Sequence, residues 1–177
     1  DKAGGITDEQ LIVASIVEKE SRSSENAAMV ASVVYNRLKA GMKLEMDPTR
    51  VYVNENITGS PLLSDTSKYA ALYNTYKCSG LPAGPICNPG NRAIKAALNP
   101  ASSEYLYFFF GNDNQNHYSK TYEEHLAAME QYGVQYGYYG YKVKKPKNLR
   151  WLYGMEQTPV FKTEGVESTK GLAWLSY

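Results

Sequence analysis

The sequence predicts an α+β domain, with helices packed beside a small antiparallel sheet and followed by a tyrosine-rich C-terminal extension. Three observations support this class. Capping-box patterns at Thr7–Gln10 and Thr121–Glu124 each open a segment with helical character. Between these segments, an aromatic run within 105–110 and a polar loop are typical of a β-hairpin. Beyond residue 131 the composition shifts to Tyr and Gly. Helices segregated from a short antiparallel pair define the α+β class.

The composition indicates a globular protein and excludes several functions. The chain has 177 residues, of which 43% are hydrophobic and 21% charged. The net charge of +1 argues against nucleic acid as a partner, because phosphate binding depends on many cationic contacts. No segment approaches the ~20 apolar residues of a membrane helix. Cys78 and Cys87 flank a Gly/Pro-rich loop, where a disulfide and two free thiols are equally compatible with the sequence. No His lies near them at ligand spacing, so we expect no zinc site.

The N-terminal elements are justified by caps and apolar periodicity. Thr7 opens a helix that contains the apolar run 11–17 and frays near residues 21–24. A second helix is expected over about 26–39, with Gly41 as the C′ residue that ends it. Asp47–Thr49 then predicts a turn, and residues 50–53 a short strand.

The middle and end of the chain are less regular. Residues 54–88 are rich in turn formers and predict a long loop, and Asn88-Pro89 predicts the start of a helix that ends at Leu98. Residues 105–110 predict a buried strand, 111–116 a hairpin loop and 117–119 the returning strand. The second capping box opens a last helix to about Gln131.

The most informative segment is Ile16–Ser21, which places two glutamates where an apolar helix ends. Glu18 and Glu20 are separated by about 200° around a helix, so they cannot face one cleft. Glu20 lies in the last turn, where the negative end of the helix dipole raises the pKa of a carboxyl group and suits a general acid. Glu18 is expected to form a salt bridge. Spacing alone favours the simpler interpretation that both residues terminate the helix.

Other polar side chains have a structural and a functional interpretation. Asp47 is typical of a turn residue. Glu124 could form an acid–base pair with His125, but its position in the capping box already explains it. His117, beside a polar loop, is either a surface histidine or a ligand contact. One further cluster mixes ring faces with amide and hydroxyl groups, which suits a sugar or braces a loop: Tyr73, Asn74, Thr75 and Tyr76.

Several short motifs occur in a fixed order along the chain. They are Ala14–Glu20; Asn36–Leu38 with Gly41 and Met42; Asp47–Thr49; Tyr73–Tyr76; Gly80–Ile86; Asn88–Gly90; Tyr105–Phe108; and His117, Ser119, Thr121, Glu124 and His125. Over residues 8–131 this ordered set closely resembles the YceG-like family, the endolytic murein transglycosylases. The chain departs from the family pattern at Arg50, where the family commonly has an aliphatic residue, and also at Ala83 and Leu126.

The resemblance implies a lysozyme-like catalytic domain over residues 1–131. The Tyr/Gly-biased remainder, 132–177, lies outside the resemblance and is expected to be an extension of unknown function packed on this domain. It implies that Glu20 is the catalytic residue and that peptidoglycan glycan strands, cut internally between MurNAc and GlcNAc, are the substrate. It places the protein on the extracytoplasmic face of a bacterial membrane, attached only through an N-terminal anchor absent from this chain. The expected substrate-binding residues are Asp47, Thr49, Tyr73, Asn74, Thr75, Tyr76, Leu81, Pro82, His117 and Ser119.

The chemistry expected from the resemblance needs one carboxyl group and neither metal nor cofactor. Glu20 would protonate the glycosidic oxygen and then accept the proton of the MurNAc C6 hydroxyl, which closes on C1 as a 1,6-anhydro ring. Asp47 or Glu45 acting as a second carboxylate would instead make a muramidase. A non-catalytic glycan-binding module, or a docking element for cell-wall synthesis enzymes, is the other alternative.

Overall fold

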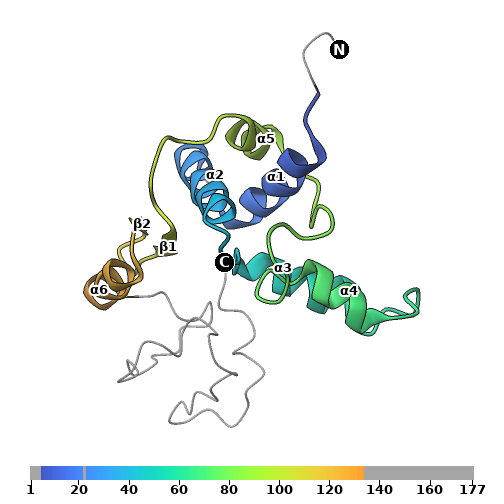
Figure 1. Cartoon of the computed structure of the whole chain (residues 1–177). Coiled ribbons are helices and arrows are strands. Elements are labelled where there is room, and N and C mark those ends of the chain that lie inside the picture. The colour runs from blue at the N-terminus through green and yellow to red at the C-terminus, as the bar shows by residue number, and fades with distance from the viewer. Residues whose placement is uncertain (1–4, 22, 134–177) are drawn as a thin grey trace, which may run out of the picture.

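The computed structural model describes residues 5–21 and 23–133 and confirms the α+β class. Of the predicted extension, 132–177, only residues 132 and 133 belong to the described part of the chain. In chain order the elements are α1 (Asp8–Glu20), α2 (Ser24–Lys39), α3 (Asp47–Tyr52), the π-helical turn η1 (Val53–Ile57), α4 (Thr66–Tyr73), α5 (Asn91–Leu98), β1 (Tyr107–Phe110), β2 (Asn116–Ser119) and α6 (Tyr122–Tyr132), as Figure 1 shows.

The hydrophobic core lies where α1, α2 and α5 pack together (Figure 1). Residues 12–17 of α1 are buried without interruption, as the near-continuous apolar run predicts. Small residues of α5 allow close approach to the two longer helices. The fully buried core side chains are Val13, Ala14, Ile16, Val17, Ala27, Val30, Ala31, Val34, Leu44 and Ala93.

The predicted caps are confirmed. Thr7 and Gln10 form both hydrogen bonds of a capping box at α1, and Thr121 and Glu124 do the same at α6. Gly41 follows the end of α2 with φ of +66°, the left-handed conformation expected of a C′ glycine. These local signals depend on a few neighbouring residues, which is why the sequence identifies them.

The prediction of a turn at 47–49 and a strand at 50–53 is wrong. Residues 47–52 form helix α3, which continues directly into η1. Pro48 occupies the first turn, where its missing N–H costs nothing, and Asp47 carries the negative charge that favours a helix N-terminus. Of the β-branched and aromatic residues that favoured a strand, Val53 is buried, and Val51 and Tyr52 are half-buried on the helix surface.

The long loop predicted over 54–88 is also partly wrong, because it contains η1 and α4. Asp65 caps α4 by accepting a hydrogen bond from the Lys68 amide at 2.9 Å. No residue of α4 is buried, so the helix lacks the apolar stripe that periodicity would detect. Helix α5 begins at Asn91, three residues after the predicted start, with Gly90 at its N-cap.

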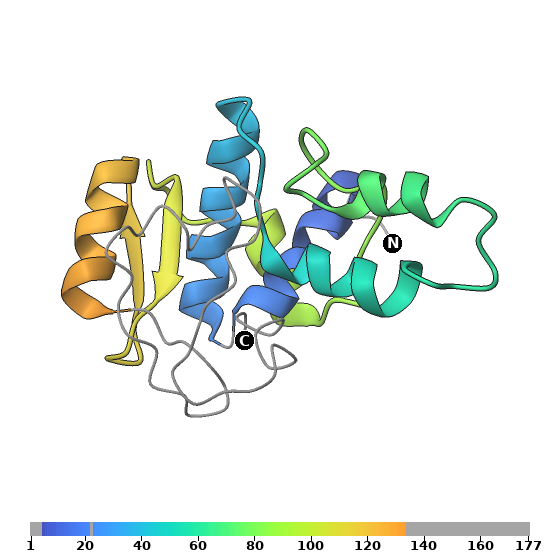
Figure 2. The ribbon, with the colours of Figure 1, turned by 90° about the horizontal axis from the view of Figure 1, so that it is seen from below.

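Within the described residues, the sheet is one antiparallel hairpin on the opposite side of the core from α4 (Figure 2). Its register pairs Tyr107 with Ser119 and Phe110 with Asn116. Strand β1 is shorter and more exposed than predicted: within it only Phe109 is buried, and Phe110 is 41% exposed. Helix α6 packs on the hairpin, and β1 contacts α2.

Arg37 joins three parts of this fold. Its guanidinium donates hydrogen bonds to the carbonyl oxygens of Leu106 at 2.6 Å and of Leu44 at 2.8 Å, and lies over the Tyr107 ring. It also pairs with the Glu45 carboxylate at 3.4 Å. A buried cation that satisfies carbonyls on both sides fixes the segment after α2 against the hairpin.

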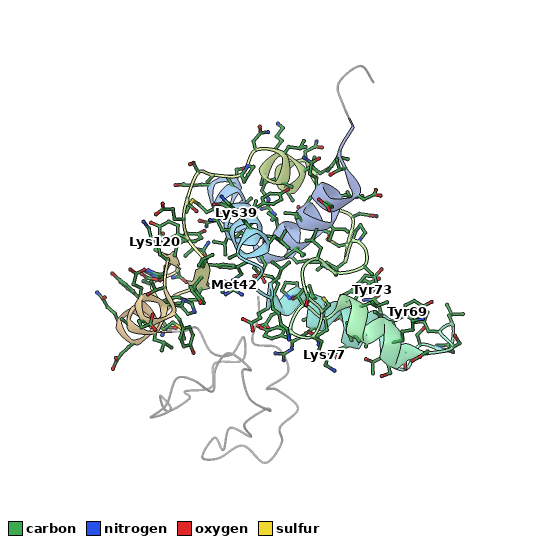
Figure 3. All side chains as sticks on the ribbon, viewed as in Figure 1. Lys39, Met42, Tyr69, Tyr73, Lys77 and Lys120 are labelled. Atoms are coloured by element: carbon green, nitrogen blue, oxygen red, sulfur yellow. The ribbon has the colours of Figure 1, made fainter. Side chains whose placement is uncertain are left out.

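The molecule has two outer sides, one formed by α4 and the other by the hairpin (Figure 3). Tyr69, Tyr73 and Lys77 lie along the arm that contains α4, whereas Lys120 lies on the side of the hairpin. Lys39 is exposed at the end of α2. Helix α1 ends between these two sides, next to the start of α3 (Figure 2).

Candidate active site

Glu20 is the last residue of α1, and its side chain is half-buried. Burial raises the pKa of this carboxyl group from 4.5 to about 8, and the negative charge of Asp47 adds to the shift. Within the described residues, the carboxyl group makes no ion pair or hydrogen bond that would stabilise its charged form. The pKa of Glu20 is therefore raised, as predicted, but the causes are burial and a neighbouring carboxylate and not the helix dipole named in the prediction. At neutral pH the group is mostly protonated.

Glu18 lies on a different side of the same helix end, as the 200° separation requires. Its carboxylate accepts a hydrogen bond from the Gly90 amide at 3.2 Å and pairs with Arg92 at 3.4 Å. These contacts place a negative charge at the N-terminus of α5, where the helix dipole favours it. The predicted salt bridge of Glu18 is confirmed.

Asp47 begins α3 and faces a tyrosine and an arginine. The Tyr76 hydroxyl donates a hydrogen bond to its Oδ1 atom at 2.8 Å, and Arg50 approaches the same oxygen at 3.4 Å. The Arg50 guanidinium also lies 5.2 Å from the centre of the Tyr76 ring. Burial and the Asp47 carboxylate raise the pKa of the Tyr76 hydroxyl, so it remains a donor. Arg50, the departure from the family pattern, is thus part of this cluster.

Thr49 and Thr75 are fully buried and hold the segment beneath the cluster. Their hydroxyls lie 2.9 Å apart, Thr49 donates to the Met46 carbonyl at 2.6 Å, and Thr75 accepts from the Met46 amide at 2.9 Å. The structure therefore brings both predicted residues to the site, but beneath its surface. Through these hydrogen bonds they fix α3 to the loop that carries Tyr76.

The other predicted residues of this loop take different positions. Asn74 ends α4 and accepts a hydrogen bond from the Tyr76 amide at 3.0 Å. The Tyr73 ring lies 5.1 Å from that of Tyr52. Pro82 is fully buried, and Leu81 packs against the core. Both thiols, Cys78 and Cys87, are free.

His117 and Ser119 belong to the hairpin and not to the junction of α1 and α3. The His117 ring stacks on Tyr132, with centroids 3.9 Å apart, and its Nε2 lies 2.9 Å from an Asp113 carboxylate oxygen. It also stacks on Phe109. Ser119 is 4% exposed. The structure thus divides the predicted site residues between two regions.

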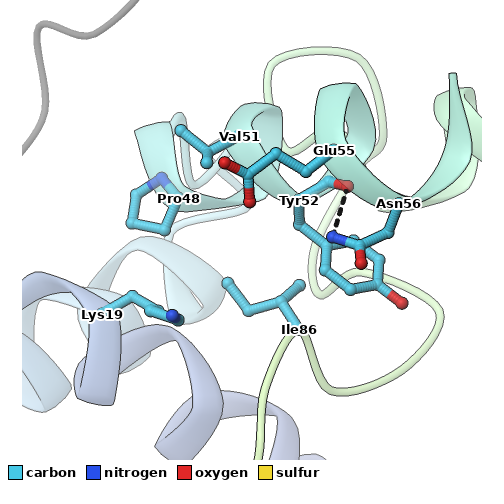
Figure 4. Close-up of a pocket in the computed structure, with 7 residues that line it drawn as sticks. All are labelled: Lys19, Pro48, Val51, Tyr52, Glu55, Asn56 and Ile86. Carbon is cyan, nitrogen blue, oxygen red and sulfur yellow. Dashed lines mark hydrogen bonds between the residues drawn. The ribbon is translucent and has the colours of Figure 1, made fainter.

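A pocket of about 260 Å³ is lined by the sequence neighbours of Glu20 and Asp47, and the sequence did not predict it (Figure 4). It is lined by Lys19 from α1, by Pro48, Val51, Tyr52, Glu55 and Asn56 from α3 and η1, and by Ile86 from the following loop. The sequence contains a signal for it, since positions 48, 51, 52 and 55 have the spacing of one helix face. That signal was lost when residues 50–53 were predicted to be a strand.

Fold and site together define an α+β domain with a protonatable glutamate at a helix end and a carboxylate cluster beside it. The model of the YceG-like family matches residues 2–131, and the chain belongs to this family. It is 39% identical over 122 residues to the endolytic murein transglycosylase of Bacillus subtilis, covering 69% of this chain and 34% of that protein. It is 32% identical over 133 residues to the endolytic murein transglycosylase of Streptococcus pneumoniae D39, covering 68% of this chain and 24% of that protein.

A crystal structure of a yceG-like protein from Listeria monocytogenes is similar as well. Its sequence is 42% identical to this chain, the TM-score is 0.54, and the match covers 68% of this chain and 38% of that one. The chain therefore spans between about a quarter and two fifths of the length of these relatives.

Proposed function

We propose that this chain is the catalytic part of an endolytic lytic transglycosylase that cleaves MurNAc–GlcNAc bonds inside peptidoglycan glycan strands. The observation that carries the proposal is Glu20, whose carboxyl group has a pKa of about 8 and stays protonated at neutral pH. The names of the relatives from Bacillus and Streptococcus support the substrate class. We assign catalysis to residues 1–131, which correspond closely to the family match at 2–131, and no function to residues 132–177.

In the proposed reaction Glu20 acts twice. Its proton passes to the glycosidic oxygen as the bond to MurNAc C1 breaks and an oxocarbenium-like centre develops. The resulting carboxylate accepts the proton of the MurNAc C6 hydroxyl, whose oxygen forms a bond to C1. The products are a 1,6-anhydroMurNAc end and a GlcNAc with a free C4 hydroxyl, and Glu20 regains its proton. The nucleophile is tethered to the substrate, so proximity takes the place of a second catalytic acid.

We assign Asp47 an electrostatic role in this scheme. The hydrogen bond from Tyr76 and the nearby Arg50 cation stabilise its carboxylate. That negative charge in turn favours the protonated form of Glu20. Tyr76 and Arg50 therefore influence the acid through Asp47.

The substrate groove is proposed to run past this cluster. Asp47, Tyr73, Asn74, Tyr76, Leu81 and Pro82 come from segments near α3 and α4, and His117 and Ser119 from the hairpin. Thr49 and Thr75 would act by holding α3 in place, and Pro82 and Ser119 by fixing the backbone beside the groove, because these four side chains are buried. Tyr and His rings supply the stacking faces and polar edges that sugars require.

We further propose that the protein acts on the extracytoplasmic side of a bacterial membrane, held by an N-terminal anchor outside this chain, with cell-wall synthesis enzymes as its partners. The relatives' names, which refer to murein, support this location. Among the described residues, no helix is both long and apolar enough to cross a bilayer.

The test is digestion of purified peptidoglycan, followed by mass spectrometry of the products. The wild type should release 1,6-anhydro ends, and Glu20→Gln should lose at least a hundredfold in rate, the lower end of the range for general acid–base catalysis. Glu9→Gln, at the other end of the same helix, is the matched control and should retain activity. Loss of activity in both variants, or full activity in Glu20→Gln, would contradict the proposal.

The coupling between Asp47 and Glu20 favours a muramidase as the second candidate. If Asp47 or Glu45 activates water, the same digestion gives reducing MurNAc ends that carry one added water. A binding module would give no products with either the wild type or Glu20→Gln while still sedimenting with peptidoglycan. Product mass distinguishes the two enzymes, and sedimentation without products identifies the binding module.

A further inference from the structure

The pocket between the end of α1 and the α3–η1 helix carries two opposite charges that the proposed glycan chemistry does not use. Lys19 extends from the end of α1, and Glu55 lies across the pocket on η1 (Figure 4). In the part of the chain that the structure describes, the two side chains form no ion pair with each other or with a third residue. Both are exposed, so they are available to a ligand.

The remaining surface of the pocket is shaped for a short chain segment. Pro48 and Ile86 are buried and apolar, while Tyr52 and Asn56 contribute a ring, a hydroxyl and an amide. The volume of about 260 Å³ is below the range of roughly 300–1,000 Å³ typical of sites for drug-sized ligands. It suits one or two amino-acid residues better than a run of sugar rings. An apolar base with a cation on one side and an anion on the other matches an amphoteric ligand.

Peptidoglycan contains one component with this chemistry. GlcNAc is uncharged, but the peptide stem on the lactyl group of MurNAc carries free carboxylates and, at its diamino acid, a free amine. The position is also suitable, because Lys19 directly precedes the proposed acid Glu20 and Pro48 directly follows Asp47. A MurNAc ring placed for cleavage at Glu20 would have its stem attached close to this pocket.

We propose that the pocket formed by α1, α3 and η1 binds the peptide stem of the MurNAc residue being cleaved, with Lys19 contacting a stem carboxylate and Glu55 the free amine. The proposal rests on the proposed function and extends it: the enzyme selects glycan strands that still carry their stems. Stem binding would also orient the MurNAc ring, because the ring and stem are covalently joined.

The kinetic test compares two substrates with the same glycan backbone. One retains its stems, and the other has been stripped of them with an amidase. The wild type should show a higher kcat/KM on the stem-bearing strands. Lys19→Met and Glu55→Gln should each reduce the ratio of the two kcat/KM values by roughly tenfold, the usual weight of one charge-assisted contact.

The matched controls are Lys39→Met, at the end of α2, and Glu123→Gln, on α6. Both are exposed and lie outside the pocket, so the ratio should not change. The proposal would be overturned if the wild type had nearly equal kcat/KM values on stem-bearing and stripped strands. It would also be overturned if the controls changed the ratio of these values as much as the pocket variants do.

A binding measurement separates this proposal from the catalytic one. A synthetic tripeptide of alanine, γ-linked glutamate and lysine is titrated into ¹⁵N-labelled Glu20→Gln protein. Amide shifts should cluster at Lys19, Glu55 and Ile86 and should disappear in Glu20→Gln/Lys19→Met. Shifts elsewhere or none would reject the stem pocket even in an active enzyme. Specific shifts with no cleavage by the wild type would uphold the pocket and reject the transglycosylase.

Discussion

At the scale of single residues, Glu20 is distinguished by a pKa set by its surroundings. Burial is the main cause of the value near 8, and Asp47 is the second. The sequence identified Glu20 through its place at the helix end and through family resemblance. It could not identify the cause, because burial and the charge of Asp47 both arise from tertiary packing, and Asp47 lies on α3, which the sequence did not predict as a helix.

Asp47→Asn tests the electrostatic part of this arrangement. The amide can still accept the hydrogen bond from Tyr76, but the negative charge beside Glu20 is removed. We expect the alkaline limb of the pH–rate profile to move to lower pH, because the pKa of Glu20 falls. Near pH 6 the rate should stay within roughly tenfold of the wild type.

Asp8→Asn, which makes the same change at the far end of α1, should leave the profile in place. A loss of more than about a hundredfold at every pH in Asp47→Asn would instead identify Asp47 as a second catalytic group.

Glu20→Gln tests the burial of the acid without relying on activity. The pKa is raised in the folded state, so the native protein is favoured fully below pH 4.5, and this stability is lost as pH rises through about 8. The variant and wild type should have similar melting temperatures at pH 4.5. At pH 9 the variant should be more stable by about 2–4 kcal/mol, a range lowered because the side chain is only half-buried.

Differential scanning calorimetry between pH 4.5 and 9 measures this difference. Glu123→Gln, which makes the same change at an exposed position on α6, is the control. A constant offset between Glu20→Gln and the wild type would contradict a raised pKa.

At the scale of elements, sequence patterns succeeded where a short local signal decides the structure. Capping boxes at Thr7 and Thr121 and the glycine at position 41 depend only on neighbours within one turn. The same reasoning failed at 47–57. There a turn, a strand at 50–53 and a loop were predicted from local preferences, but packing of α3 against α1 and the threonine pair beneath it stabilise a helix. Division of the predicted site between α3 and the hairpin is likewise a tertiary property that residue spacing does not contain.

Thr49→Val tests whether the threonine pair fixes α3. The substitution keeps the shape of the side chain but removes a hydroxyl that contacts Met46 and Thr75. The buried Thr75 hydroxyl and amide each lose a partner, so we expect a loss of about 1–3 kcal/mol in the free energy of unfolding.

Urea denaturation measures this loss, with Thr58→Val as the exposed control. The double variant Thr49→Val/Thr75→Val should lose less than the sum of the two single changes, since it leaves no orphaned hydroxyl. Strict additivity would show that the two hydroxyls do not act as a pair.

At the scale of the whole molecule, the stability contributions of two titratable groups, Glu20 on α1 and His125 on α6, change in opposite directions with pH. Burial lowers the pKa of His125 to about 4, with Arg37 as a second cause. Its contribution to stability is complete above pH 6.5 and is lost as pH falls through about 4. Glu20 acts in the reverse direction between pH 4.5 and about 8.

We therefore expect maximal thermal stability near pH 5.5, midway between the ordinary pKa values of 4.5 for Glu20 and 6.5 for His125, by linkage. Melting temperatures measured from pH 4 to 9 should describe a dome. His125→Phe preserves the ring stacked on Tyr107 and should flatten the acidic side, whereas Glu20→Gln should flatten the alkaline side. A melting temperature that rises steadily to pH 9 in the wild type would contradict this balance.

Three consecutive side chains in the last turn of α1 lie against three different parts of the fold. Glu18 reaches α5, Lys19 the pocket, and Glu20 the neighbourhood of Asp47. Each step along a helix turns by about 100°, so deleting one residue from this turn would rotate all three side chains together. Every one would then point to the wrong neighbour, although the composition of the segment would hardly change. Across relatives, this turn should therefore tolerate substitution at Lys19 far better than any change in length, whereas the surface loop around residues 60–64 should vary freely in length.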